Sequence, residues 1–138
     1  MALVLDTHVW IWMVEGVRRL GRGTVARIEA EAREGAVYIP AIGLWEVAML
    51  VKRRRVSLSL PVEQWLDLAL AQPGFVLSPL SPRIVAESTE LPGGFSLDPA
   101  DNLIIATART LPATLVTHDE RIFRYASEGH VSVLGKAD

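Results

Sequence analysis

The stretch Ala2-Leu3-Val4-Leu5-Asp6 is the first indication of the fold, because an unbroken apolar run ends abruptly at a carboxylate. An apolar run without polar alternation is typical of a strand that is covered on both faces. A second such run, Thr114-Leu115-Val116-Thr117, ends two residues before Asp119. The sequence therefore predicts two buried strands, each followed by an acidic residue.

Short apolar strands alternate with helical segments along the rest of the chain. We expect further strands at residues 37–39, 75–77 and 131–134, and helices at about residues 7–14, 24–34, 41–54, 61–72, 82–90, 98–110 and 119–127. This alternation predicts an α/β fold whose central parallel sheet has four to five short strands. Right-handed crossovers place the carboxyl ends of such strands along one edge, which is where ligands bind.

Composition limits the classes of protein to which the chain can belong. Its 138 residues fit one domain, residues 1–138, and half of them are hydrophobic. The absence of cysteine excludes disulfides and thiolate metal sites and fits a cytoplasmic location. No apolar stretch reaches the roughly 20 residues of a membrane span, and the first residues do not have the pattern of a signal peptide. The net charge of −2 means that any contact with nucleic acid must use local basic clusters or a metal ion.

Four acidic residues are expected to meet at the carboxyl edge of the sheet. Asp6 and Asp119 follow predicted strands, and Asp101 lies in the first turn of a predicted helix. Glu46 is the only charged residue between Ala41 and Val51, and a carboxylate in such apolar surroundings is costly to bury unless it is paired, protonated or metal-bound.

Each acid also has a simpler interpretation. Asp6, Asp101 and Asp119 could serve only to satisfy free N–H groups at helix starts, and Asp98, followed by Pro99, resembles such a cap more closely than a metal ligand. Glu46 could be a buried acid that is hydrogen-bonded in the core. The combination is harder to explain by capping than any single member.

Carboxylates without a histidine cluster suit a hard cation. Mg²⁺ or Mn²⁺ is therefore expected rather than zinc. The acids could share one ion or divide between two, as in phosphodiester cleavage by two metal ions.

Several segments spread over nearly the whole chain form a pattern when they are taken in order: Leu3 to Trp12 with Asp6-Thr7-His8, Leu44-Trp45-Glu46-Val47-Ala48, the basic stretch Lys52 to Arg55 followed by Val56-Ser57-Leu58, Asp98-Pro99-Ala100-Asp101 followed by Leu103 to Ala108, and Leu115-Val116-Thr117-His118-Asp119. Together these segments resemble the PIN-domain toxins called VapC. Each segment is short, but their order and spacing are specific.

The resemblance implies a three-layer α/β/α fold and a Mg²⁺-dependent endoribonuclease that hydrolyses RNA phosphodiester bonds. It implies the toxin of a type II toxin–antitoxin system, a homodimer, and a cognate antitoxin as partner. Carried over by position, it makes Asp6, Glu46, Asp101 and Asp119 the catalytic, metal-binding acids, with supporting roles for the hydroxyl of Thr117, for Thr7 and for Asp98.

The chain departs from this pattern beside the acids. Asn102 stands where arginine is common, and Ser96-Leu97 precede Asp98 where His-Arg is common. Both changes remove positive charge, and they leave open the alternative of a weak or inactive PIN-like scaffold that acts through protein partners.

Residues outside the acidic set have two interpretations each. Lys52, Arg53, Arg54, Arg55 and Asn102 are candidates for contact with RNA or an antitoxin, although a basic helix end in solvent is equally compatible with the pattern. We expect the tryptophans at positions 10, 12, 45 and 65 in the core or at an interface rather than stacked on bases.

Other phosphate enzymes fit the sequence less well. A phosphatase of the haloacid-dehalogenase type needs a second Asp two residues after the first, where this chain has His8. The acidic pair and lysine of a response-regulator receiver are missing. Flap-type DNA nucleases use similar acids but are longer.

Overall fold

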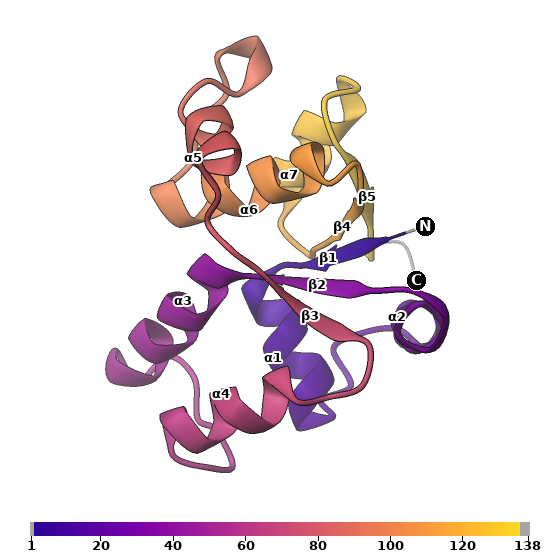
Figure 1. Cartoon of the computed structure of the whole chain (residues 1–138), viewed down its shortest axis with the longest axis vertical. Helices are drawn as coiled ribbons and strands as arrows, with labels where there is room; N and C mark the ends of the chain where they lie inside the picture. The colour runs from indigo at the N-terminus through magenta and orange to yellow at the C-terminus, as the bar shows by residue number, and fades with distance from the viewer. Residues whose placement is uncertain (1, 136–138) are drawn as a thin grey trace.

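The centre of the molecule is a parallel sheet of five strands, described here from a computed structural model that covers residues 2–135. The strands lie in the order β3-β2-β1-β4-β5 (Figure 1), which agrees with the predicted parallel sheet. Their bounds are β1 (Leu3–Leu5), β2 (Val37–Pro40), β3 (Phe75–Ser78), β4 (Thr114–Val116) and β5 (Ser132–Leu134).

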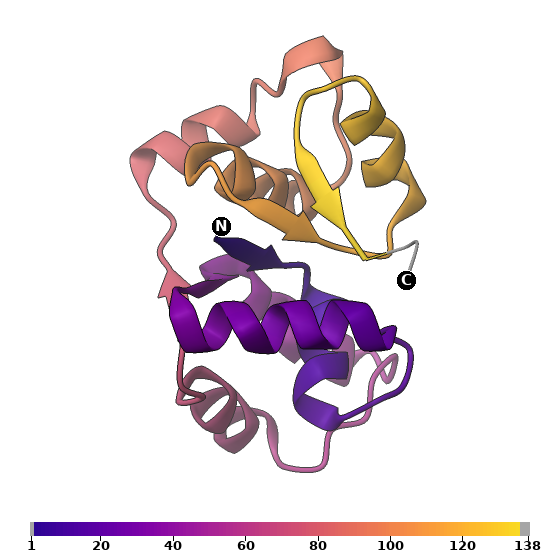
Figure 2. The same ribbon diagram turned by 90° about the vertical axis from the view of Figure 1, so that its right-hand side faces the viewer.

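Helices cover both faces of this sheet and give three layers (Figures 1 and 2). One face carries α1 (Thr7–Glu15), α2 (Arg22–Glu34), α3 (Ala41–Lys52) and α4 (Val62–Leu70). The other carries α5 (Pro82–Ser88), α6 (Pro99–Thr110) and α7 (Glu120–Ser127), with a short 3-10 turn at Pro92–Gly94 between α5 and α6.

Burial on both faces explains the continuous apolar runs in the strands. Leu3 and Leu5 pack into the core beneath α1 to α4, whereas Val4 packs into the core beneath α5 to α7. Side chains of successive strand residues point to opposite faces, so a strand between two helical layers needs an apolar residue at every position.

The strand order brings the ends of β1 and β4 together. The chain leaves β1, builds β2 and β3 toward one edge, and returns to place β4 on the other side of β1. Leu5 is in register with Val116, and the N–H of Asp6 donates to the carbonyl of Val116 at 3.0 Å. Open α/β sheets bind ligands at such a reversal of strand order.

The observed boundaries differ from the sequence prediction mainly at helix ends. Helix α2 begins at Arg22 rather than at residue 24, because Gly21 supplies the extended residue before its first turn. Helix α3 ends at Lys52 rather than at residue 54, and Arg54 adopts a positive φ of 56° that no α-helix can continue. Helices α4 and α5 are also shorter than expected, and the last strand begins at Ser132.

None of the helices within residues 2–135 combines the length and the apolar character that crossing a membrane requires.

We expect the two-layer core to dominate stability. Leu115 in β4 is fully buried, so Leu115→Ala should lower the free energy of unfolding by about 2–5 kcal/mol through lost burial and a residual cavity. Leu68 on α4 is 56 % exposed, so Leu68→Ala should change it by no more than about 0.5 kcal/mol. Urea unfolding monitored by circular dichroism measures both, and equal losses would contradict this view of the core.

Candidate metal centre

Asp6 follows β1 and uses its two carboxylate oxygens for different tasks. Its Oδ1 accepts a hydrogen bond from the N–H of Thr7 at 2.8 Å, which caps the start of α1. Its Oδ2 accepts a hydrogen bond from the hydroxyl of Thr117, beyond the end of β4, at 2.6 Å. Asp6 is therefore a helix cap, but capping uses only one of its two carboxylate oxygens.

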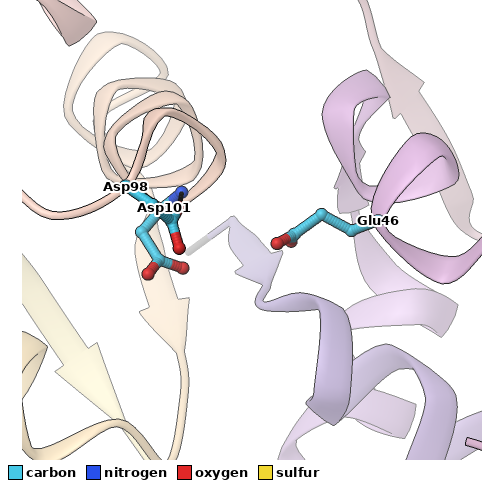
Figure 3. Close-up of side chains that lie close together, drawn as sticks. All are labelled: Glu46, Asp98 and Asp101. Carbon is cyan, nitrogen blue, oxygen red and sulfur yellow. Dashed lines mark hydrogen bonds between the residues drawn. The ribbon is translucent and has the colours of Figure 1, made fainter. Parts of the chain in front are cut away.

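Glu46 reaches the same region from the middle of α3. The buried hydroxyl of Thr7 donates to Oε1 of Glu46 at 2.5 Å. The carboxylate points from α3 toward the first turn of α6 (Figure 3). Two threonine hydroxyls, those of Thr7 and Thr117, thus hold two of the four predicted acids.

The start of α6 supplies two further carboxylates, Asp98 and Asp101. Oδ1 of Asp98 accepts a hydrogen bond from the N–H of Asp101 at 2.8 Å, so the capping prediction for Asp98 is correct. Asp98, Asp101 and Glu46 also bring one oxygen each to within 4.8 Å of one another (Figure 3). Asp98 therefore belongs to the acidic group, in addition to its role as the cap of α6.

Asp119 caps α7 and is paired with an arginine. Its Oδ1 accepts hydrogen bonds from the N–H and Nε of Arg121 at 2.9 Å and 3.1 Å, and its Oδ2 accepts one from Nη2 at 2.6 Å. The same Nη2 lies 3.4 Å from Oδ2 of Asp101. Sequence reasoning did not single out Arg121, although a cation in the first turn of a helix is unusual enough to serve as a signal.

These acids line a single groove of about 980 Å³. Its remaining walls combine apolar, aromatic and basic side chains: His8, Trp12, Arg19, Ile42, Trp45, Met49, Leu50, Arg53, Arg55, Pro99, Ala100, His118 and Arg121, with the acids Asp6, Glu46, Asp98, Asp101 and Asp119. The structure therefore brings all four acids predicted from the sequence into one place, together with Asp98.

The acids destabilise one another's charged forms. Burial first, and then the nearby carboxylates of Asp6, Asp98, Glu46 and Asp119, together raise the pKa of Asp101 to about 7. Burial also raises the pKa of Asp6 and that of Glu46, against the lowering effect of their threonine hydrogen bonds. Carboxylates that are crowded in this way favour either a shared proton or a bound cation.

Asp119 behaves differently because it has a counter-ion. The hydrogen bonds and positive charge of Arg121 hold the pKa of Asp119 below its ordinary value, despite partial burial. One guanidinium therefore neutralises Asp119 at 2.6 Å and reaches Asp101 at 3.4 Å, whereas none of the ion pairs found in residues 2–135 involves Asp6 or Glu46.

The oxygen atoms that the group offers suit a hard cation. All are carboxylate oxygens, supported by threonine hydroxyls, which suits an ion such as Mg²⁺ or Mn²⁺. His8 and His118 line the groove, but the ring of His118 packs edge-on against Trp12 at 5.1 Å between centroids. Its buried Nε2 finds no partner among the described residues.

The predicted contact residues divide between the groove and other places. Arg53 and Arg55 line the groove, whereas Lys52 and Arg54 are not among its lining residues. Asn102 is committed to the preceding loop, since its Oδ1 accepts from the N–H of Leu97 at 2.8 Å and its amide donates to the hydroxyl of Ser96 at 3.1 Å.

The tryptophans also divide into two kinds. Trp10 and Trp65 are buried and meet edge to face at 5.2 Å, as expected for core residues. Trp12 and Trp45 line the groove, and Trp45 is 55 % exposed. An indole that is this exposed beside the acids is available to a ligand or a partner.

Comparison with known proteins gives concordant matches over most of the chain. The PIN domain family matches residues 3–128. Ribonuclease VapC22 of Mycobacterium tuberculosis is 38 % identical over 120 residues, which is 87 % of this chain and 88 % of that protein.

Solved structures agree on the fold. VapBC2 from Rickettsia felis, bound to a DNA fragment from its promoter, has a chain that superposes with a TM-score of 0.70 at 19 % identity, covering 97 % of this chain and 98 % of that one. VapBC-1 from nontypeable Haemophilus influenzae gives a TM-score of 0.68 at 18 % identity over the full length of both chains. The three-layer fold that the sequence predicts is thus the fold of these proteins.

The raised pKa of Asp101 predicts how stability depends on pH. The folded protein binds a proton at Asp101 up to a pKa of about 7, whereas the unfolded chain loses it near the ordinary value of 3.8. Between these values the folded state holds more protons, so stability should fall as the pH rises through this window.

Thermal unfolding in EDTA tests this dependence. Asp101→Asn should be more stable than the wild type at about pH 8, and this difference should nearly vanish at about pH 4. Asp67→Asn, at an exposed position on α4, serves as the control and should follow the wild-type profile. A profile of Asp101→Asn parallel to that of the wild type would show that Asp101 is not the responsible group.

Proposed function

This chain belongs to the PIN-domain family, and from that premise we propose that it is a metal-dependent endoribonuclease, the toxin of a toxin–antitoxin pair. The observation that carries the proposal is the groove in which Asp6, Glu46, Asp101 and Asp119 converge. Ribonuclease VapC22, a relative at 38 % identity over most of both chains, supports the assignment of RNA as substrate.

We assign Mg²⁺ or Mn²⁺ as the ion and Asp6, Glu46, Asp101 and Asp119 as the acids that hold it, with Asp98 at their side. A bound ion of this kind makes a coordinated water more acidic and neutralises charge on phosphate oxygens. Thr117 and Thr7 act on the acids, because their hydroxyls fix one oxygen of Asp6 and one of Glu46. The second oxygen of Glu46 stays available to an ion, whereas the second oxygen of Asp6, Oδ1, already caps the start of α1.

RNA binding is proposed along the same groove. Arg19, Arg53 and Arg55 line it together with the acids, so the phosphate backbone meets local positive charge although the chain as a whole carries −2. A substrate of this kind is consistent with a cytoplasmic protein.

The antitoxin is proposed to cover this groove as well. Structural neighbours include a chain from VapBC2 of Rickettsia felis and one from a toxin–antitoxin complex of Klebsiella pneumoniae. The apolar wall made by Ile42, Trp45, Met49 and Leu50 suits the apolar face of a peptide segment, and the acids beside it suit basic residues on that segment.

A homodimer is proposed on the edge of the sheet that carries β3. Val76 and Leu77 in β3, Leu80 after it and Val85 in α5 are each 43 % exposed. Four large apolar side chains exposed within one short stretch of chain are typical of a surface that a partner covers. A second copy of the chain would cover them and also protect the strand edge.

Removing one acid tests the enzymatic proposal. Asp6→Asn should lower the rate of cleavage of single-stranded RNA at least about 100-fold, because charge stabilisation by an ion contributes several kcal/mol to catalysis. Expression of the wild type without antitoxin should arrest bacterial growth, and expression of soluble Asp6→Asn should not. Glu63→Gln, an exposed change on α4, is the control and should remain active.

The same measurements separate the enzyme from an inactive scaffold. A wild type that neither binds Mn²⁺ in calorimetry nor cleaves single-stranded RNA would contradict the enzymatic proposal and favour the scaffold. Cleavage of single-stranded DNA or duplex in preference to RNA would contradict the assigned substrate.

A charge placed in the exposed apolar stretch tests the homodimer. Val85→Asp should convert a dimer to a monomer in light scattering, because dimerisation would bury the new carboxylate without a partner. Val17→Asp, at a residue that is 42 % exposed in the segment between α1 and α2, should leave the mass unchanged. A wild type that is monomeric at high concentration would rule the dimer out.

A further inference from the structure

Arg121 makes contacts that the fold itself does not require. Its guanidinium spans the groove wall from Asp119 to Asp101, with Nη2 at 2.6 Å from Oδ2 of Asp119 and at 3.4 Å from Oδ2 of Asp101. The side chain is 51 % exposed, whereas the side chains of the two carboxylates it bridges are 21 % and 14 % exposed. The arginine therefore covers the acids from the solvent side.

The position of Arg121 is unfavourable by local criteria. It is the second residue of α7, directly after Glu120 and two residues after the capping Asp119. The first turn of a helix carries the positive end of the helix dipole, where acidic residues are favoured and cations are not. The side-chain hydrogen bonds found for Arg121 among the described residues go to Asp119 and Asp101, so these contacts offset its unfavourable position.

The surroundings leave Arg121 as the cation closest to the acidic group. Asn102 stands where related sequences were expected to carry arginine, and its amide is bonded to the preceding loop. Arg53 and Arg55 line the groove from the segment after α3, but the ion pairs to the groove acids found among residues 2–135 are made by Arg121. A divalent ion that binds these acids must compete with this guanidinium.

We propose that Arg121 is the exchangeable cation of the metal centre: it neutralises Asp119 and Asp101 when no divalent ion is bound, gives up the Asp119 oxygen to the ion, and then contacts the RNA phosphate. The last part rests on the proposed ribonuclease function. A guanidinium presents five N–H donors in a planar fork, so it can keep one carboxylate contact while other donors turn to a phosphate. A phosphate held beside Asp101 lies within the reach that the 3.4 Å contact already demonstrates.

The proposal predicts opposite changes in two affinities. Removing Arg121 removes a competitor for the acids, so the protein should bind Mn²⁺ more tightly. The same change removes a phosphate contact, so RNA binding should weaken. A residue that only stabilised the local structure would lower both affinities together.

Calorimetric titration with Mn²⁺ measures the first change. We expect Arg121→Gln to bind Mn²⁺ about 3- to 10-fold more tightly than the wild type, since one positive charge next to the site is lost. The thermal stabilisation that Mg²⁺ gives should increase in the same direction. Arg121→Lys keeps the positive charge but loses the planar array of N–H donors. Its affinity for Mn²⁺ should lie between those of the wild type and Arg121→Gln.

Fluorescence anisotropy with a short single-stranded RNA measures the second change. Ca²⁺ replaces Mn²⁺ here, and gel electrophoresis checks that the strand stays intact. Arg121→Gln should weaken binding about 10-fold and reduce the slope of log affinity against log salt by about one. The matched control is Arg124→Gln, at an exposed arginine in the last turn of the same helix, which should alter neither affinity by more than twofold or so.

Two results would overturn the inference while the proposed function stands. In the first, the wild type binds both Mn²⁺ and RNA, but Arg121→Gln binds Mn²⁺ no more tightly than the wild type does. The other is a loss of RNA affinity in Arg121→Gln no greater than that in Arg124→Gln. A wild type that binds no Mn²⁺ at all would overturn both the inference and the metal centre on which the proposed function depends.

Discussion

The pairing of β1 with β4 brings negatively charged side chains close together, and the other residues of the site reduce the repulsion between them. The register places Leu5 beside Val116, so the residues that follow both strands emerge side by side. Asp6 and Asp119 are among them, and α3 and α6 contribute Glu46, Asp98 and Asp101 to the same groove. Burial, together with repulsion from the neighbouring carboxylates, raises the pKa of Asp101 to about 7.

The chain limits this repulsion without removing it. Thr117 and Thr7 each donate a hydroxyl hydrogen bond to one acid, and Arg121 neutralises Asp119. Together they hold the carboxylates in place, and Asp101 has only the longer, 3.4 Å contact with a guanidinium that it shares with Asp119. Carboxylates with shifted pKa values are characteristic of functional sites, because a protein gives up some folding stability at the positions where it must bind a ligand.

Sequence alone predicted those site residues whose position follows from backbone geometry. Asp6 and Asp119 follow buried strands, and parallel strands share an edge whatever the side chains do. Side-chain direction was harder to predict: α3 is apolar almost all round, so nothing in its pattern distinguished buried Val47 from Trp45, which is 55 % exposed. Asp98 looked like a cap and is one, but a carboxylate has two oxygens, and the pattern could not say where the second lies. Arg121 depends on a contact with Asp101 across 20 residues, which no local motif encodes.

The same constraint explains how a chain with a net charge of −2 can act on a polyanion. With its acids ionised and no ion bound, the centre of the groove repels phosphate, and the basic residues Arg19, Arg53 and Arg55 lie only along its walls. Under the proposed function, a divalent ion would offset part of this negative charge and, by displacing Arg121 from Asp119, would free a guanidinium beside it. Affinity for RNA would then rise with metal occupancy, because the ion and the freed guanidinium add positive charge to that of the groove walls. A basic surface would bind nucleic acid equally in either state, whereas this groove would favour binding in the state that can cleave it.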